Sequence, residues 1–319
     1  MTVVCLLKLR YRPQRNKARV NIFTRLAYAP FFTQLVVIRK CNLSCGYCNE
    51  FDKTSDPVPV DVLKERLRHL KNLGAYSVCL TGGEPTLHPD LVELVRFCRY
   101  DLKFLKTVMI TNGFYLTEPL IKALNAAGLQ DMQISIDGVK TNAVTIKVLD
   151  SLRRRLELLQ KFADFNVVVS GVVGSCPPEE SFEVIEYAKR MQFRPRVLLI
   201  HGPDGQVKLN ADELRVYERI KKIVPRHFYE ISDYRDRIVK TGVAPFKCRA
   251  GSRYLYVDED GIVSWCSQTR DVFQKPLLNY TANDLQEQFY TYKSCQDRCT
   301  LGCVRSSSAF DGWRTQNVV

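Results

Sequence analysis

Six short runs rich in β-branched residues alternate with six amphipathic stretches between residues 33 and 223, and this alternation restricts the fold more than any other feature. Strands that are separated by helices of this length pair in parallel, and the helices cover the outside of the sheet. The sequence therefore predicts an α/β protein built on a partial (β/α)6 TIM-like barrel at residues 31–235. The expected strands are residues 33–39, 76–85, 105–113, 129–138, 165–174 and 194–202.

The pattern changes in the C-terminal part of the chain. Residues 252–268 predict a β-hairpin whose turn is Asp-Glu-Asp-Gly at 258–261, and a short helix is expected at 282–292. Five cysteines lie in the same region. We therefore expect a small C-terminal cysteine-rich domain of β-hairpin and helix at residues 240–310, followed by a tail at 311–319.

The N-terminal part is strongly basic. Residues 1–40 contain nine Lys or Arg and no acidic residue, so they supply +9 of the net charge of +13. A basic arm at residues 1–30 suggests an anionic partner such as a membrane surface, a nucleic acid or a phosphorylated substrate. The alternative is a solvated arm that covers the barrel edge.

No apolar run is long enough to span a bilayer, and the N-terminus lacks the apolar core and cleavage site of a signal peptide. The sequence therefore predicts a protein that is not transmembrane. We expect it to be cytoplasmic, with residues 1–40 available for peripheral contact with an anionic membrane surface.

Three cysteines, Cys41, Cys45 and Cys48, follow the first expected strand with the spacing C-x3-C-x2-C. Structural zinc sites need four ligands, whereas three thiolates can hold a cubane iron–sulfur cluster and leave one iron open to a small molecule. The loop lies where barrel enzymes place their chemistry, at the C-terminal end of a strand. The alternatives are a buried thiol patch and an incomplete zinc site.

Two motifs in this chain resemble those of radical S-adenosylmethionine (SAM) enzymes. They are the three-cysteine loop with Tyr47 before its last cysteine, and the glycine-rich Thr81–Pro85 "TGGEP" after the second strand. The resemblance covers roughly residues 31–310. It implies a [4Fe–4S] cluster that binds SAM, an electron donor such as flavodoxin or ferredoxin, and a 5′-deoxyadenosyl radical that abstracts hydrogen from an organic substrate.

The resemblance also assigns cofactor-binding residues. The carbonyls of Gly82 and Gly83 and the carboxylate of Glu84 are expected to bind the methionyl ammonium, and glycine lets a backbone approach a ligand closely. Many relatives carry an Arg shortly after the fourth strand, where this chain has Lys140 and Lys147. Tyr47 and Asn112 are also expected to bind the cofactor. Ser135 and Asp137 are expected near the carboxylate and ribose of SAM, and the backbone of residues 170–174 near its adenine. A turn or a helix cap is the alternative for Asn112 and Asp137.

The second cysteine group resembles the auxiliary-cluster module, of the twitch or SPASM type, found at the C-terminus of many radical SAM enzymes. Five thiols fit a single auxiliary [4Fe–4S] cluster. Four ligands would close that cluster as an electron relay, and three would leave one iron for substrate. Zinc is the alternative metal. The candidates are Cys248, Cys266, Cys295, Cys299 and Cys303, and we favour Cys295 as the spare.

The substrate is predicted in outline only. We expect oxidation or C-centred modification of a small molecule or lipid. The alternatives are a peptide maturase and, in another class, an iron–sulfur or zinc protein that binds nucleic acid or acts as a scaffold. His201 and Cys176 end the sixth and fifth strands, so they are catalytic candidates, and His201 is suited to accept a proton. A strand-capping His and an inert loop thiol are the alternatives.

Overall fold

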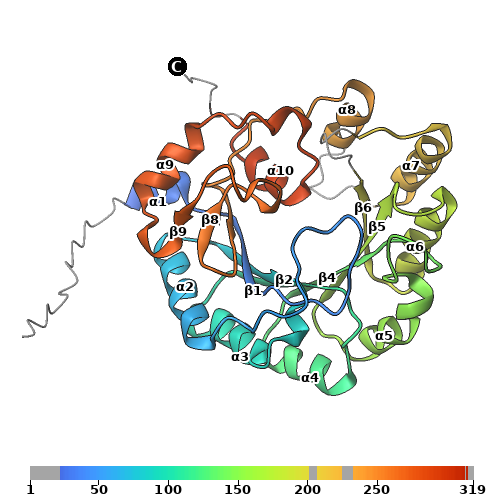
Figure 1. The fold of residues 1–319 in the computed structure, drawn as a ribbon, viewed down its shortest axis with the longest axis horizontal. Coiled ribbons are helices and arrows are strands. Elements are labelled where there is room, and N and C mark those ends of the chain that lie inside the picture. Colours follow the sequence, from blue (N-terminus) through green and yellow to red (C-terminus); the bar gives the residue numbers. More distant parts are fainter. Residues whose placement is uncertain (1–21, 201–206, 225–232, 313, 315–319) are drawn as a thin grey trace, which may run out of the picture.

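A computed structural model of the chain describes residues 22–200, 207–224, 233–312 and 314. In these ranges the strands form one curved sheet in the order β6-β5-β4-β3-β2-β1-β7-β8-β9, with helices along its outer side (Figure 1). The first six strands pair in parallel, which confirms the predicted partial barrel. They are β1 (Phe32–Ile38), β2 (Ser77–Gly82), β3 (Lys106–Thr111), β4 (Asp131–Ile136), β5 (Asn166–Val173) and β6 (Arg194–Leu199).

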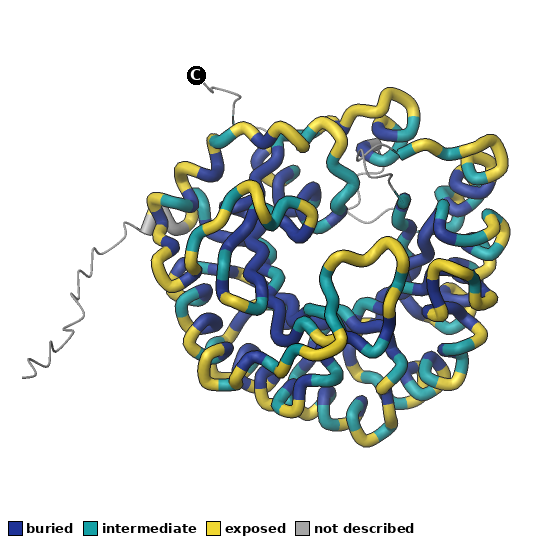
Figure 2. The backbone as a smooth tube through the Cα atoms, viewed as in Figure 1, coloured by how far each residue is buried: buried dark blue, intermediate teal, exposed yellow. Residues whose placement is uncertain are grey.

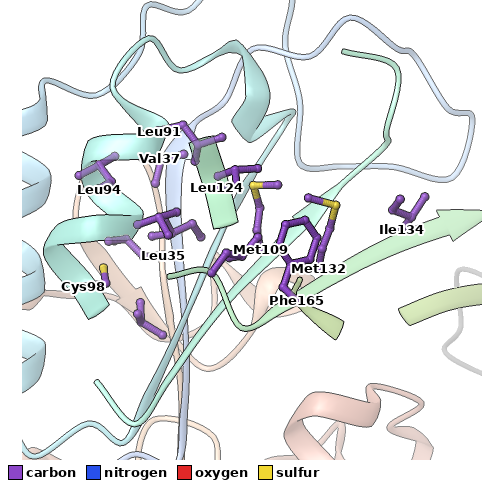
Figure 3. Packing of buried hydrophobic residues seen from close by; sticks show 14 of the residues in the cluster. Leu35, Val37, Leu91, Leu94, Cys98, Met109, Leu124, Met132, Ile134 and Phe165 are labelled. Atoms are coloured by element: carbon purple, nitrogen blue, oxygen red, sulfur yellow. The ribbon is translucent and has the colours of Figure 1, made fainter. Parts of the chain in front are cut away.

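The outer face of the barrel holds the main hydrophobic core. Alternate strand side chains such as Leu35, Met109 and Ile134 point outward and pack against buried leucines of the helices (Figure 3). Full burial of each such side chain stabilises the fold by roughly 1.5–3 kcal/mol. The covering helices are α2 (Val60–Asn72), α3 (Leu91–Arg96), α4 (Glu118–Ala126), α5 (Leu149–Phe162), α6 (Pro178–Arg190) and α7 (Ala211–Ile223).

The C-terminal segment extends the same sheet. Strand β7 (Tyr254–Val257) pairs in parallel with β1, and β8 (Ile262–Ser264) and β9 (Lys275–Pro276) follow in antiparallel. The predicted hairpin is confirmed, with Gly261 at a positive φ of 82° in its turn. Figure 2 shows buried backbone continuing from the barrel into these strands.

Four more α-helices lie in the described part of the chain. They are α1 (Ile22–Tyr28), α8 (Asp233–Thr241), α9 (Ala282–Tyr290) and α10 (Gly302–Ala309). A helix was predicted only for α9. The boundary expected between residues 235 and 240 falls inside α8, and α1 lies within the segment expected to be an arm.

Candidate active site

The three-cysteine loop leaves β1 at the C-terminal end of the barrel and lies in front of the strand ends (Figure 1). Cys41 is buried, Cys45 is half-buried and Cys48 is exposed, and all three are free thiols. Burial raises the pKa of the Cys41 thiol, so its thiolate needs a positive partner. Iron supplies such a partner in Cys-ligated clusters, and this donor set therefore fits one.

The glycine pair packs directly against the start of the cysteine loop. A Cβ on Gly82 would overlap the carbonyl oxygen of Ile38, and a Cβ on Gly83 would overlap that of Arg39. The backbone N–H of Gly83 donates to the Ile38 carbonyl at 2.9 Å, and the N–H of Glu84 donates to the Lys40 carbonyl at 3.0 Å. These glycines therefore let the end of β2 support the cysteine loop backbone to backbone.

Glu84 is fully buried and joins the ends of β2 and β3. One of its carboxylate oxygens accepts from the Thr111 hydroxyl at 2.6 Å, and the other accepts from the Asn112 N–H at 2.7 Å. Thr86 donates two further hydrogen bonds. Burial raises the pKa of Glu84, and these donors oppose that shift. The role of Glu84 toward a ligand ammonium stays a prediction, because such a ligand would share the carboxylate with these donors.

Asn112 reaches the cysteine loop from the end of β3. Its side-chain N–H group donates to the Asn42 side-chain oxygen at 2.7 Å and lies 3.7 Å from the Cys41 sulfur. Its own oxygen accepts from the Phe114 N–H at 3.1 Å, as in a turn. The structure thus gives Asn112 both a turn contact and a contact with the loop that carries the thiols.

Tyr47, Asp137 and Lys147 form a hydrogen-bonded group between the cysteine loop and the segment after β4. The Tyr47 hydroxyl donates to Asp137 at 2.6 Å and accepts from the Lys147 ammonium at 2.7 Å, and Lys147 and Asp137 are 3.3 Å apart. Burial and the neighbouring Asp137 raise the pKa of Tyr47, so the phenol keeps its proton. Ser135 lies 3.4 Å from the other Asp137 oxygen.

Helix α5 begins at Leu149, and the residues directly before it hold the cysteine loop. The Val144 carbonyl accepts from the Gly46 N–H at 2.9 Å, and the Thr145 hydroxyl lies 3.4 Å from the Cys45 sulfur. Lys147 was noted in the sequence only as a departure from the family pattern. Its contact with Tyr47, 100 residues away, depends on this loop.

Replacing Lys147 with Met should destabilise the protein, because it leaves the buried Asp137 carboxylate without its cation. We expect the free energy of unfolding, measured by urea denaturation, to fall by about 3 kcal/mol. Lys140→Met is the matched control on the same loop, since Lys140 is exposed, and it should change stability by less than about 0.5 kcal/mol. Equal effects of the two substitutions would contradict this role for Lys147.

The two predicted catalytic residues do not join this group. His201 lies outside the described residues. Cys176 is half-buried in the β5–α6 connection, two residues before α6, with its sulfur 3.2 Å from the Ser181 hydroxyl. A Cβ on Gly138 would meet the Cβ of Cys176 at 2.8 Å, and burial raises the pKa of its thiol. These contacts are those of a packed loop thiol, and a catalytic role for Cys176 stays a prediction.

Four cysteines of the second group share one hydrophobic cluster. Cys248, Cys266, Cys299 and Cys303 pack with Tyr254 and Val304, whereas Cys295 is exposed. Burial raises the pKa of the Cys266 thiol to about 12, and the Cys248 thiol adds to this by electrostatic repulsion. The four grouped cysteines are those favoured from the sequence.

Across the described residues, no three His, Cys, Asp or Glu side chains are arranged as ligands of a metal ion.

Polar side chains that sequence reasoning missed line the inner face of the barrel. Arg196 on β6 donates to the side-chain oxygen of Gln133 on β4 at 3.0 Å. Ser170 on β5 pairs in register with Arg196, and its hydroxyl is buried without a hydrogen-bond partner among the described residues. Arg194 and Arg196 stand two residues apart on β6 and therefore on one face of the strand, which was the available signal.

Comparisons with known proteins agree with this geometry. The model of the Radical SAM superfamily matches residues 35–214. A probable GTP 3′,8-cyclase of Saccharolobus solfataricus is 29% identical over 259 residues, which are 75% of this chain and 83% of that protein. The GTP 3′,8-cyclase of Helicobacter pylori is 29% identical over 177 residues, 52% of this chain and 54% of that protein.

Among solved structures, Streptococcus suis SuiB bound to its precursor peptide SuiA aligns with a TM-score of 0.62 at 16% identity, covering 84% of this chain and 67% of that chain. SuiB bound to S-adenosylmethionine aligns with a TM-score of 0.60 at 18% identity, covering 84% of this chain and 66% of that chain. At these identities the likeness shows a shared fold.

Proposed function

This chain belongs to the Radical SAM superfamily of iron–sulfur enzymes, and we propose that it abstracts a hydrogen atom from a small anionic substrate held inside the barrel. The observation that carries the proposal is the cysteine loop itself. It lies at the C-terminal end of the barrel and is held by the backbone of Gly83 and Glu84 and by Asn112.

In this proposal Cys41, Cys45 and Cys48 hold the [4Fe–4S] cluster. When bound, the cluster and SAM supply a 5′-deoxyadenosyl radical through one-electron reductive cleavage, and flavodoxin or ferredoxin is a suitable donor. The chain contributes position and solvent exclusion. Tyr47, Asp137 and Ser135 offer hydrogen-bonding groups to the polar parts of SAM, and Lys147 supplies the positive charge expected at this position from an Arg.

The inner face of the barrel supports an anionic substrate. A guanidinium binds a carboxylate or phosphate through two parallel hydrogen bonds, and Arg196 lies beside the Ser170 hydroxyl, which has no partner among the described residues. The relatives named above are named for GTP, itself an anion, so nucleoside phosphates are the first class to test. Carboxylates are the second class.

The test follows deuterium from substrate to 5′-deoxyadenosine. Reduced, reconstituted protein is incubated with SAM and with a deuterated nucleoside triphosphate, a carboxylate or a peptide. Transfer from an anionic small molecule supports the proposal, and transfer from the peptide alone would indicate a peptide maturase instead. Arg196→Leu should raise the KM for the active substrate at least about tenfold. Arg190→Leu, on the exposed end of α6, is the control.

The second cysteine group is proposed to hold one auxiliary [4Fe–4S] cluster through Cys248, Cys266, Cys299 and Cys303, and their shared burial supports this set. Replacing Cys248 and Cys266 together with Ala should lower the iron content from about eight to about four per chain. Cys295→Ala should leave it at about eight. A parent protein that holds about four iron together with zinc, measured by mass spectrometry, would contradict the assignment.

A further inference from the structure

One end of the barrel exposes five large apolar side chains. Tyr76 and Leu105 directly precede β2 and β3, and helix α1 precedes β1, so these residues lie at the end of the barrel opposite the cysteine loop. We call this group the lower rim. Its members and their exposed fractions are Phe23 (75%), Leu26 (62%), Tyr76 (45%), Leu105 (62%) and Phe310 (60%).

Three members of the lower rim, Tyr76, Leu105 and Phe310, lie around the ring of Phe31. Helix α1 is joined to them through Arg253, which donates to the Leu26 carbonyl at 3.3 Å and lies 4.3 Å from the centroid of the Phe31 ring. The ring of Phe31 lies 4.7 Å from the ring of Phe310 and 5.9 Å from that of Tyr76, measured between centroids. The Leu105 N–H donates to the Tyr76 carbonyl at 3.0 Å. A linked apolar surface of this kind marks an interaction site, whereas single exposed apolar residues need no explanation.

Helix α1 presents its exposed residues from a fixed position. The Tyr28 hydroxyl lies 3.0 Å from that of Tyr290, and Arg314 donates to the Ala27 carbonyl at 2.5 Å. Phe23 and Leu26 are three residues apart, so they share one face of the helix. These contacts anchor the C-terminal end of α1, and most of the surface of Phe23 and of Leu26 is exposed.

The chain that adjoins the lower rim in sequence is basic. Residues 1–21, which run directly into α1, contain six Lys or Arg and no acidic residue. On the barrel itself Lys71 donates to the carbonyl of the exposed Lys103, two residues before Leu105. A surface that combines exposed aromatic and aliphatic side chains with Lys and Arg suits the interface of an anionic bilayer. A nucleic acid would use the charge but leave the aliphatic residues in water.

We propose that the lower rim docks the protein on an anionic lipid bilayer. Phe23, Leu26 and Phe310 enter the headgroup region, and the basic residues beside them meet anionic headgroups. No described helix is long and apolar enough to cross a membrane, so the contact is a surface one. The cysteine loop then faces the aqueous side, and docking leaves the mouth of the barrel open.

The test uses the full-length chain and vesicle sedimentation. Binding to phosphatidylcholine vesicles that contain phosphatidylglycerol should be at least about tenfold tighter than to pure phosphatidylcholine. Phe23→Asp with Leu26→Asp should weaken it at least about tenfold. The matched control is Val243→Asp with Val272→Asp, which places the same charges at exposed apolar positions outside the lower rim and should bind like the parent. Deleting residues 1–21 should make binding weaker and less dependent on salt.

SAM cleavage in the absence of substrate should be equal in the parent and in all these variants. Equal cleavage also verifies that the variants fold. Undiminished vesicle binding by the Phe23/Leu26 variant would overturn the proposal. A second result would also overturn it: the parent shows no preference for anionic vesicles, and both the parent and the Phe23/Leu26 variant bind polyuridylate RNA.

Discussion

Replacing Cys41, Cys45 and Cys48 together with Ala should abolish SAM cleavage and lower the iron content from about eight to about four per chain. The three thiols are free and lie on one loop at the barrel mouth, whereas the second cysteine group lies in a separate cluster beside β7. Removing the first group should therefore spare the second. The measurements are iron per chain after anaerobic reconstitution and 5′-deoxyadenosine by chromatography.

Cys98→Ala is the control for this experiment, because Cys98 is buried in the main core, away from both groups. It should keep all its iron and its activity. An undiminished iron content in the triple variant would show that the cysteine loop holds no cluster.

Placing a methyl group on Gly83 should have almost as large an effect. A Cβ there would lie 2.5 Å from the Lys40 carbonyl oxygen and closer still to that of Arg39, and both are backbone atoms that cannot move aside alone. The cysteine loop must shift, so we expect Gly83→Ala to reduce SAM cleavage at least about 100-fold, since displacement by about 1 Å can cost that much.

Gly46→Ala is the matched control on the cysteine loop itself. The atom nearest to a Cβ at this position is 3.7 Å away, an ordinary contact. This variant should retain activity within about threefold, in line with a surface substitution that costs under 0.5 kcal/mol. Similar losses in the two variants would mean that any alanine near the loop is harmful, and that the packing of Gly83 on the loop is not the cause.

The barrel could be predicted from the sequence because its signal is local. Each strand and helix carries its own periodicity, and glycines such as Gly74 and Gly128 end the helices. The same reasoning missed β7 as a neighbour of β1. That pairing joins residues about 220 positions apart, and no local pattern reports it.

The candidate active site, too, could be predicted only in part. The cysteine spacing and the glycine pair were readable because they are contiguous motifs. The role of the two glycines could be predicted only in part, since Gly82 makes room for the Ile38 carbonyl and Gly83 for that of Arg39, as well as for any ligand. Lys147 and Arg196 could not be assigned from sequence, because their partners Tyr47 and Gln133 come from other strands or loops.

The lower rim and the cysteine loop lie at opposite ends of the barrel. If the lower rim contacts a bilayer, substrates reach the cysteine loop from water, which favours the small anionic molecule over an embedded lipid. The two proposals remain separable, since vesicle binding requires no cluster and SAM cleavage requires no vesicle.

The central claim is that this chain uses its cysteine loop to cleave SAM, and the direct measurement is 5′-deoxyadenosine formed by the anaerobically reconstituted, dithionite-reduced protein. We predict several turnovers of 5′-deoxyadenosine together with methionine, and none in the variant that lacks Cys41, Cys45 and Cys48. Absence of 5′-deoxyadenosine from protein that carries its full iron content, or equal amounts from that variant, would contradict the claim.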